Sequence, residues 1–103
     1  MESIDPWNVR FSQDSIKPSF RDGETLDALV EGLRSGSIRS DTIPPIRLVD
    51  IDGVFYSLDN RRLEAFRRAG VKVPFRRART DEVQNEKHKF TTRNDGVSIR
   101  VRQ

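Results

Sequence analysis

The spacing of apolar residues in the first half of the chain predicts one amphipathic helix followed by a β-hairpin. Between Thr25 and Gly36, leucine and valine side chains recur with the i, i+3, i+4, i+7 spacing of a helix that buries one face. Residues 46–51 are rich in Val and Ile and predict a strand. The dipeptide Asp52-Gly53 after them is typical of a type I′ turn, so we expect a returning strand over 54–57.

A second helix and shorter elements are predicted in the other half. Residues 61–69 carry a helical pattern that Asp59 or Asn60 can cap and that Gly70 can end. The sequence then predicts a strand over 71–77, a short polar helix from Thr80 or Asp81 to Lys87, and, after an Asn94-Asp95-Gly96 turn, a strand with alternating apolar residues over 97–101.

These elements describe a compact α+β domain. A short strand over 9–11 is expected to open it, and residues 12–15 offer turn chemistry. The order of elements indicates a small mixed β-sheet packed by two main helices. Residues 1–8 are interpreted as a leader or the stump of a linker, so the single predicted domain covers 9–103.

Composition narrows the chemistry that the chain can perform. Its 103 residues include no cysteine, which excludes disulfides, a thiol nucleophile and cysteine-ligated metals. No stretch approaches the roughly 20 apolar residues of a membrane-spanning helix, so no membrane partner is expected. Aspartates are scattered without the spacing of metal ligands; we therefore expect no metal and no cofactor, although a divalent metal is an unsupported alternative.

Charge is divided unevenly along the chain. The formal net charge is +3, but residues 1–60 hold 6 Lys/Arg against 11 Asp/Glu, whereas residues 61–103 hold 13 against 5. Most cations are arginines, which suit bidentate phosphate contacts. This asymmetry favours a polyanionic partner, either a nucleic acid or the phosphates of a nucleotide; the alternative is a solvated basic helix paired with acidic residues of the first half.

Arg62 stands out on the second predicted helix. At 100° per residue it falls inside the apolar arc of that helix, and a buried arginine needs a fixed anionic partner. One reading is an internal bridge to Asp59, Asp50 or Asp14. The other is an anion cradle in which Arg61, Arg62 and the backbone amides after Asn60 bind phosphate at a helix N-terminus. Three further cations of this helix region fall outside the arc and are expected to be solvated: Arg61, Arg67 and Arg68.

The same segment carries a family resemblance. GVFYSLDNRRLEAFRRAGV over 53–71, followed by Val73-Pro74-Phe75, resembles the ParB/sulfiredoxin-like superfamily, where a hairpin leads into a Gly-Glu-Arg-Arg or Gly-Cys-His-Arg box at a helix start. Upstream, residues 15–18 and the helix ending in LRSG over 33–36 resemble the first motif of that family and the helix after it. The resemblance covers 9–77, roughly two thirds of the chain, and implies a ParB/sulfiredoxin-like fold.

Within that superfamily the chain resembles the ParB-like toxin modules. The segments that carry this likeness are FSQDSI over 11–16, LDNRRL over 58–63 and KFTT over 89–92. Such modules lie at the C-terminal ends of large bacterial polymorphic toxins of the Rhs and contact-dependent inhibition type. The resemblance therefore implies a domain that is secreted or delivered as part of a larger toxin, acts in the target-cell cytoplasm, and is neutralised by a cognate immunity protein, expected to be acidic.

Residue by residue, the resemblance transfers only part of the family's chemistry. The box aligns with Asp59-Asn60-Arg61-Arg62, so Arg61 and Arg62 carry over as phosphate contacts. Asn60 stands where sulfiredoxin has its nucleophilic cysteine, which excludes sulfinic acid reduction. Asp59 and Asn60 replace the Gly and Glu of the ParB box, which weakens the transfer of CTP hydrolysis and its metal site.

Several other residues are candidates for the chemistry. Gln13 and Asp14 follow the first predicted strand, where they can face the start of the second helix or simply form a turn. His88 lies between two lysines that favour its neutral form; it is either a general base or merely exposed. Lys89 and Thr91 complete the phosphate-binding candidates, with Asn60, Arg61, Arg67 and Arg68.

We therefore predict a polymorphic-toxin domain that acts on nucleic acid as a nuclease. Arg61 and Arg62 would stabilise phosphate charge, and Asp59, His88, Gln13 or Asp14 would position or activate the nucleophile. One alternative is a nucleotide-binding or nucleotide-transferring domain that uses the same cradle to hydrolyse a nucleoside triphosphate. A further alternative is a non-catalytic adaptor whose basic face binds an acidic protein.

Overall fold

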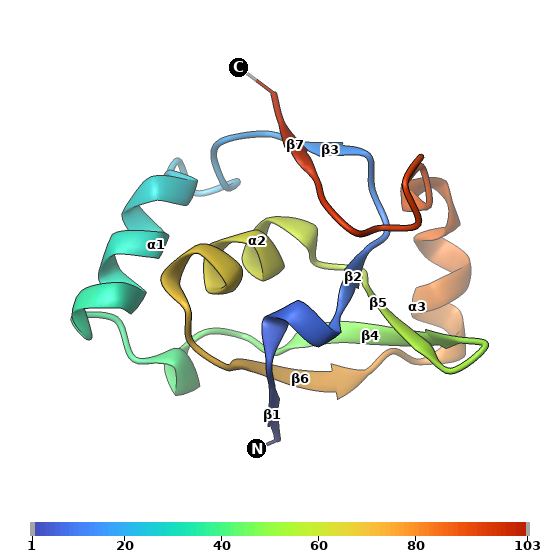
Figure 1. Ribbon diagram of the computed structural model, residues 1–103, viewed down its shortest axis with the longest axis horizontal. Coiled ribbons are helices and arrows are strands. Elements are labelled where there is room, and N and C mark those ends of the chain that lie inside the picture. Colours follow the sequence, from blue (N-terminus) through green and yellow to red (C-terminus); the bar gives the residue numbers. More distant parts are fainter. Residues whose placement is uncertain (1, 103) are drawn as a thin grey trace.

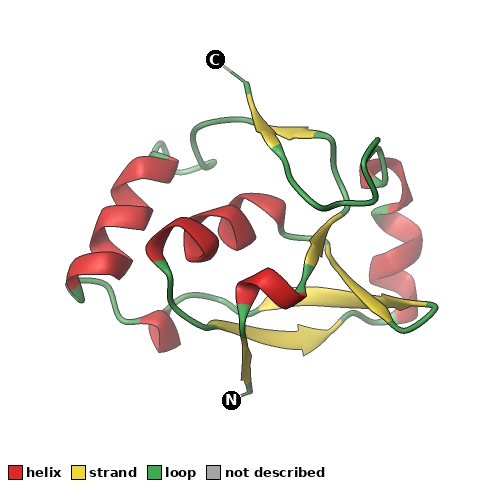
Figure 2. Cartoon of the chain, viewed as in Figure 1, coloured by secondary structure: helices red, strands yellow, loops and turns green. Residues whose placement is uncertain are grey.

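A curled five-stranded sheet forms the base of the domain. The computed structural model describes residues 2–102 (Figures 1 and 2). The strand order is β1-β6-β4-β5-β2, with both parallel and antiparallel neighbours, which confirms a small mixed α+β fold. The strands are β1 (Ser3–Ile4), β6 (Val73–Arg77), β4 (Ile46–Ile51), β5 (Val54–Ser57) and β2 (Arg10–Phe11).

The predicted hairpin is confirmed at its predicted bounds. Strands β4 and β5 pair antiparallel, with Ile51 level with Val54. Asp52 and Gly53 both have positive φ, 53° and 84°, as a type I′ turn requires. The amide of Gly53 also donates to Asp50 Oδ1 at 2.8 Å, which tightens the turn.

Two ten-residue helices pack against each other and close the core. Helix α1 (Leu26–Ser35) begins where Thr25 Oγ1 accepts a hydrogen bond from the Ala28 amide, and α2 is Asn60–Ala69. Gly36 and Gly70 end the two helices in the left-handed conformation, as predicted. The core between these helices and the sheet contains Val9, Phe11, Ile16, Leu26, Val30, Leu33, Ile46, Leu48, Leu63, Ala65, Phe66 and Val73.

Smaller elements surround this core. Helix α3 is Thr80–Asn85, and one-turn 3-10 helices cover Pro6–Asn8 (η1), Ser40–Thr42 (η2) and Lys87–Lys89 (η3). A separate two-stranded sheet pairs β3 (Ser15–Ile16) with β7 (Arg100–Val101) in parallel. In Figure 1, α1 and α3 lie on opposite sides of α2.

Several predicted boundaries shift in the structure. The described part of the predicted leader contributes β1 and η1, so the sheet begins before the predicted domain boundary at residue 9. The strand expected over 97–101 is reduced to Arg100–Val101, because Gly96 and Val97 lie in a turn that docks on β2. The strand over 71–77 starts at Val73, and the helix over 80–87 ends at Asn85 before η3.

The turn at 94–96 shows why the C-terminal segment stays close to the sheet. Asp95 and Gly96 have positive φ, and the Gly96 carbonyl accepts the Phe11 amide at 2.8 Å. A Cβ at Gly96 would lie 2.2 Å from the Phe11 carbonyl oxygen, so only glycine fits here.

Candidate functional site

A pocket of about 350 Å³ opens at the first turn of α2. It brings six of the predicted site residues together: Gln13, Asp59, Asn60, Arg61, Arg62 and Lys89. Leu58 lines the pocket beside them, as do three residues of the loop before α1, namely Phe20, Arg21 and Asp22. The pocket is therefore built where α2, that loop and η3 meet.

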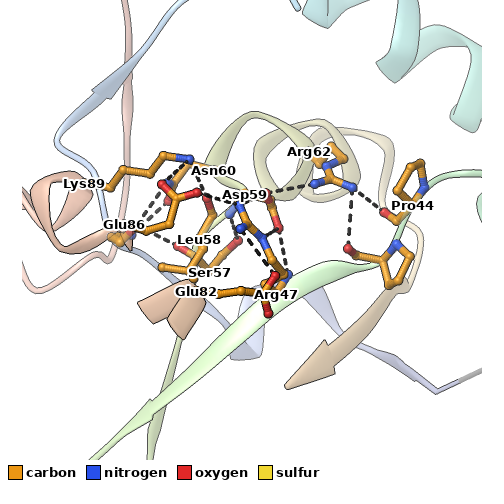
Figure 3. Close-up of polar contacts among 12 residues, drawn as sticks. Pro44, Arg47, Ser57, Leu58, Asp59, Asn60, Arg62, Glu82, Glu86 and Lys89 are labelled. Atoms are coloured by element: carbon orange, nitrogen blue, oxygen red, sulfur yellow. Dashed lines mark hydrogen bonds and ion pairs between the residues drawn. The ribbon is translucent and has the colours of Figure 1, made fainter. Parts of the chain in front are cut away.

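Asp59 precedes α2 but does not cap it. Its carboxylate accepts hydrogen bonds from the Arg47 backbone amide, Nε and Nη2 at 2.8, 3.0 and 2.8 Å, and pairs with Arg62 Nη2 at 2.8 Å (Figure 3). No side chain caps the helix. The first-turn N–H groups of α2 therefore have no carboxylate as hydrogen-bond partner, and the start of the helix stays electropositive. Burial alone would raise the pKa of Asp59. The hydrogen bonds from Arg47 and the charge of Arg62 lower it by more, so the net pKa is below its ordinary value. Asp59 is thus a fixed carboxylate and a poor proton acceptor.

Arg62 is held from both sides. Nη1 donates to the Pro44 carbonyl at 2.6 Å, while Nη2 reaches Asp59 Oδ1 at 2.8 Å (Figure 3). The internal bridge to Asp59 is therefore present, with backbone carbonyls as additional partners. Arg62 still lines the pocket, where its side chain is 22% exposed.

Arg61 is the more available of the two box arginines. Its Nη1 donates to the Ser19 carbonyl at 2.6 Å, and its guanidinium carbon lies 5.4 Å from the centre of the Phe20 ring. These contacts fix the side chain at the pocket wall without a carboxylate partner among residues 2–102. Arg21 adds a second, exposed cation to the same wall.

Asn60 lines the pocket with a buried, hydrogen-bonded side chain. Its Oδ1 accepts the Ser12 amide at 2.9 Å, and its Nδ2 donates to Ser12 Oγ at 3.0 Å and to Gln13 Oε1 at 3.1 Å. The Asn60 side chain is buried and fully engaged, so only its backbone can meet a ligand. Gln13 is fixed by the same contact and presents its amide at the pocket.

Lys89 enters the pocket from η3 as part of a larger ionic cluster. Nζ donates to the Leu58 carbonyl at 3.2 Å and pairs with Glu86 at 3.1 Å, and Glu86 in turn pairs with Arg47 at 3.2 Å. Burial raises the pKa of Glu86, but Lys89 and Arg47 lower it below its ordinary value. The bidentate hydrogen bonds from Arg76 lower the pKa of Glu82 to about 2.

Five predicted residues lie outside the pocket lining, and three of them are Asp14, Thr91 and His88. Asp14 pairs with Arg100 at 3.1 Å, and its amide donates to Thr91 Oγ1 at 3.1 Å, so these residues join β3 to the C-terminal segment. Thr91 also donates its amide to the Ser12 carbonyl. His88 is exposed on η3, directly before Lys89.

Arg67 and Arg68, two predicted phosphate contacts on α2, bind other parts of the protein and do not line the pocket. Arg67 is 7% exposed, so the expectation that it is solvated is wrong. Its guanidinium donates to the carbonyls of Pro6, Val9 and Val97 and lies against the Trp7 and Phe11 rings at 4.6 and 4.4 Å. Arg68 points toward α1 and pairs with Glu64 at 2.8 Å and Asp27 at 3.5 Å.

Sequence reasoning missed Arg47 and the loop residues Phe20 and Arg21. Arg47 alternates with the buried Ile46 and Leu48 in β4, and a charged residue in an apolar strand is a signal that it needs a partner. Phe20 and Arg21 carry no such signal, because their place beside α2 depends on how the loop folds.

Three comparisons with known proteins found no match for this chain. The chain matches no known family model, no curated protein and no solved structure. No helix within residues 2–102 has the length and apolar character needed to cross a membrane. In the same range, no three His, Asp or Glu residues are grouped so that they could hold a metal ion.

Proposed function

We propose that this chain is a ParB/sulfiredoxin-like toxin domain that binds nucleic acid at the α2 pocket and cleaves its phosphodiester backbone. The observation that carries the proposal is the uncapped first turn of α2 beside Arg61, Arg62, Arg21 and Lys89. Backbone N–H groups at a helix start together with guanidinium groups are a suitable binding site for a phosphate. Six of the residues predicted for this chemistry line the pocket, which supports the same interpretation.

The proposed chemistry divides the pocket residues into roles. The first-turn amides of α2 and Arg61 would stabilise the negative charge that develops on the phosphate oxygens during attack. Gln13 would orient the attacking oxygen of a water or a ribose hydroxyl. Asp59 would act as a positioning residue, because its carboxylate is saturated by Arg47 and Arg62 and its pKa is lowered.

His88 is the group that we assign as general base. It precedes Lys89, which lines the pocket, but His88 itself is exposed outside the lining, so its side chain would have to turn toward the bound substrate to accept a proton. The nucleophile would pass its proton to His88 as its oxygen bonds to phosphorus, and the bond from phosphorus to the leaving oxygen would break, with the leaving oxygen taking a proton from water. In the target cell, an acidic immunity protein would inhibit the domain by covering this basic pocket.

The test is degradation of total RNA and plasmid DNA by the purified chain, with and without EDTA. We expect cleavage that Arg61→Ala reduces by about 100-fold or more, since removing one charge-stabilising donor has effects of this order. Lys72→Ala is the matched control, because Lys72 is exposed beyond the opposite end of α2 and should retain full activity. Intact nucleic acids with a folded wild-type chain would refute the nuclease proposal.

A second candidate is a nucleotide-binding domain that uses the same phosphate contacts. The pocket volume of about 350 Å³ favours it, because small-molecule sites begin at roughly this size. Isothermal titration with nucleoside triphosphates distinguishes the two. Binding of one nucleotide that Arg61→Ala abolishes, with RNA and DNA left intact, would favour this function.

A further inference from the structure

A second hollow, with a volume of about 540 Å³, adjoins the α2 pocket. It lies between α1, the loop before α1 and the segment over 38–44, and its lining is mostly apolar. Leu29, Ile38 and Ile43 are half-buried in this lining, with one side of each packed against the core. We call this hollow the apolar groove. Its size and apolar lining are typical of sites that hold a flat organic group.

The apolar groove is continuous with the α2 pocket. Phe20, Asp22 and Arg62 line both of them. The Arg62 guanidinium lies between the two: Nη2 pairs with Asp59 at 2.8 Å on the pocket side, and Nη1 donates to the Pro44 carbonyl at 2.6 Å on the groove side (Figure 3). A single ligand with an anionic group at the start of α2 can therefore extend an attached group into the apolar groove.

The two hollows differ in charge, which sets the orientation of such a ligand. The α2 pocket has three cations that the groove lacks, namely Arg21, Arg61 and Lys89. The groove has the carboxylates of Asp22 and Glu24 at its rim. A phosphate is attracted to the first hollow and repelled by the second. The group that enters the groove should thus be uncharged, with apolar faces and hydrogen-bond donors at one edge.

A closed turn holds these two carboxylates in place. The Phe20 amide donates to the Glu24 carbonyl at 2.7 Å, and the Gly23 amide donates back to the Phe20 carbonyl at 3.0 Å. Asp22 Oδ1 accepts the Glu24 amide at 3.0 Å. Within residues 2–102 neither carboxylate forms an ion pair, and that of Glu24 accepts no hydrogen bond. Both therefore retain acceptor oxygens for the donors of a ligand.

We propose that the apolar groove binds the guanine base next to the phosphate that the α2 pocket holds. Guanine has two neighbouring donors, N1–H and N2–H, on one edge, and a carboxylate can accept from both. Adenine and cytosine present one amino group beside an acceptor, and uracil presents a single N–H between two acceptors. The inference rests on the proposed function for its phosphate contacts and deepens it by making guanine the preferred base.

Isothermal titration with the 5′-monophosphates of guanosine, adenosine, cytidine and uridine tests this site. We expect the guanine nucleotide to bind more tightly than the other three by about fivefold to 150-fold, the discrimination that one bidentate contact to a base provides. Glu24→Gln should remove most of this preference, because an amide replaces one of the two acceptors with a donor. Glu31→Gln is the matched control, since it makes the same change at an exposed carboxylate of α1 outside the groove.

A second variant fills the groove and leaves the phosphate contacts in place. Ala28 is exposed on α1 and lines the groove, and leucine is also a good helix former, so Ala28→Leu should fold normally. We expect it to weaken guanine nucleotide binding at least fivefold and to leave the affinity for inorganic pyrophosphate unchanged. Circular dichroism verifies the fold of each variant.

Three outcomes would overturn the guanine site. They are equal affinity for the four nucleotides or binding of none of them, a Glu24→Gln variant that keeps the full preference, and an Ala28→Leu variant with normal affinity. Guanine-selective binding with RNA and DNA left intact would refute the nuclease proposal and leave the groove standing. Cleavage that Arg61→Ala reduces, with no preference for guanine beside the cut, would do the reverse.

Discussion

The two halves of this domain are held together by different forces. Helices α1 and α2 pack mainly through apolar side chains, with Leu63 and Phe66 completely buried and the Arg68–Asp27 pair at the surface of the contact. The segment of α3 and η3 instead attaches through ion pairs centred on Arg47, which contacts Asp59 and Glu86. Apolar packing is insensitive to pH, whereas ion pairs depend on pH and salt. The stability of the two halves should therefore respond differently to the same change in pH or salt.

The largest effect is expected from the apolar half. Phe66→Ala removes a ring that is 0% exposed from the contact between α2 and the sheet. Large-to-small changes of this kind cost about 3–5 kcal/mol in the free energy of unfolding, a large fraction of a small domain's total of about 5–15 kcal/mol. Urea unfolding followed by circular dichroism should show this loss, and a cost below about 1 kcal/mol would contradict the packing described.

The ionic half should be most sensitive at Arg47. Arg47→Ala leaves Asp59 and Glu86 without their shared cation. We expect the free energy of unfolding to fall by about 2–3 kcal/mol, because a largely buried carboxylate that loses its cation is left with an uncompensated charge. Arg76→Ala is the internal control. It removes a single, more exposed partner of Glu82 and should cost clearly less. Equal effects of the two variants would show that Arg47 is not the centre of the cluster.

The same cluster predicts a stability loss in acid. The pKa of Glu82 is lowered to about 2, and the pKa values of Asp59 and Glu86 are also below their ordinary values. Below about pH 4.5 the unfolded chain takes up protons that these folded-state carboxylates do not, so their contribution is full above that pH and is lost as pH falls toward 2. Hydrogen exchange at pH 6 and pH 3 should show protection falling first in 80–90. Glu82→Gln should flatten this pH dependence, and an unchanged slope would contradict the assignment.

Local patterns predicted much of the fold, whereas contacts distant in sequence were not predicted. Helix α1 and the Asp52-Gly53 hairpin follow from spacing and turn chemistry within a few residues. The pairing of β3 with β7 joins segments about 85 residues apart, and no pattern in either strand specifies the other. The strand β1 was also missed, because its two residues are too few to show the alternation of a strand.

The candidate site shows the same limit at the level of single side chains. Helical periodicity predicted that Arg62 points inward, but it left the choice of partner open, and the structure gives Asp59. Periodicity was misleading for Arg67. That residue lies outside the apolar arc of α2, yet η1 and the turn at Val97 fold over it and supply carbonyl acceptors. A helical wheel describes one helix and contains no information about segments that later cover it.

The smallest effect is expected where an ion pair lies at the surface of the apolar half. Arg68 pairs with Glu64 one helical turn away, and its side chain is 38% exposed. Water and salt screen such a pair, and Arg68→Ala should change the free energy of unfolding by about 0.5 kcal/mol or less. Urea unfolding in low and high salt provides the measurement. A cost comparable to that of Arg47→Ala would mean that α1 and α2 also depend on charge, and the contrast between an apolar and an ionic half would fail.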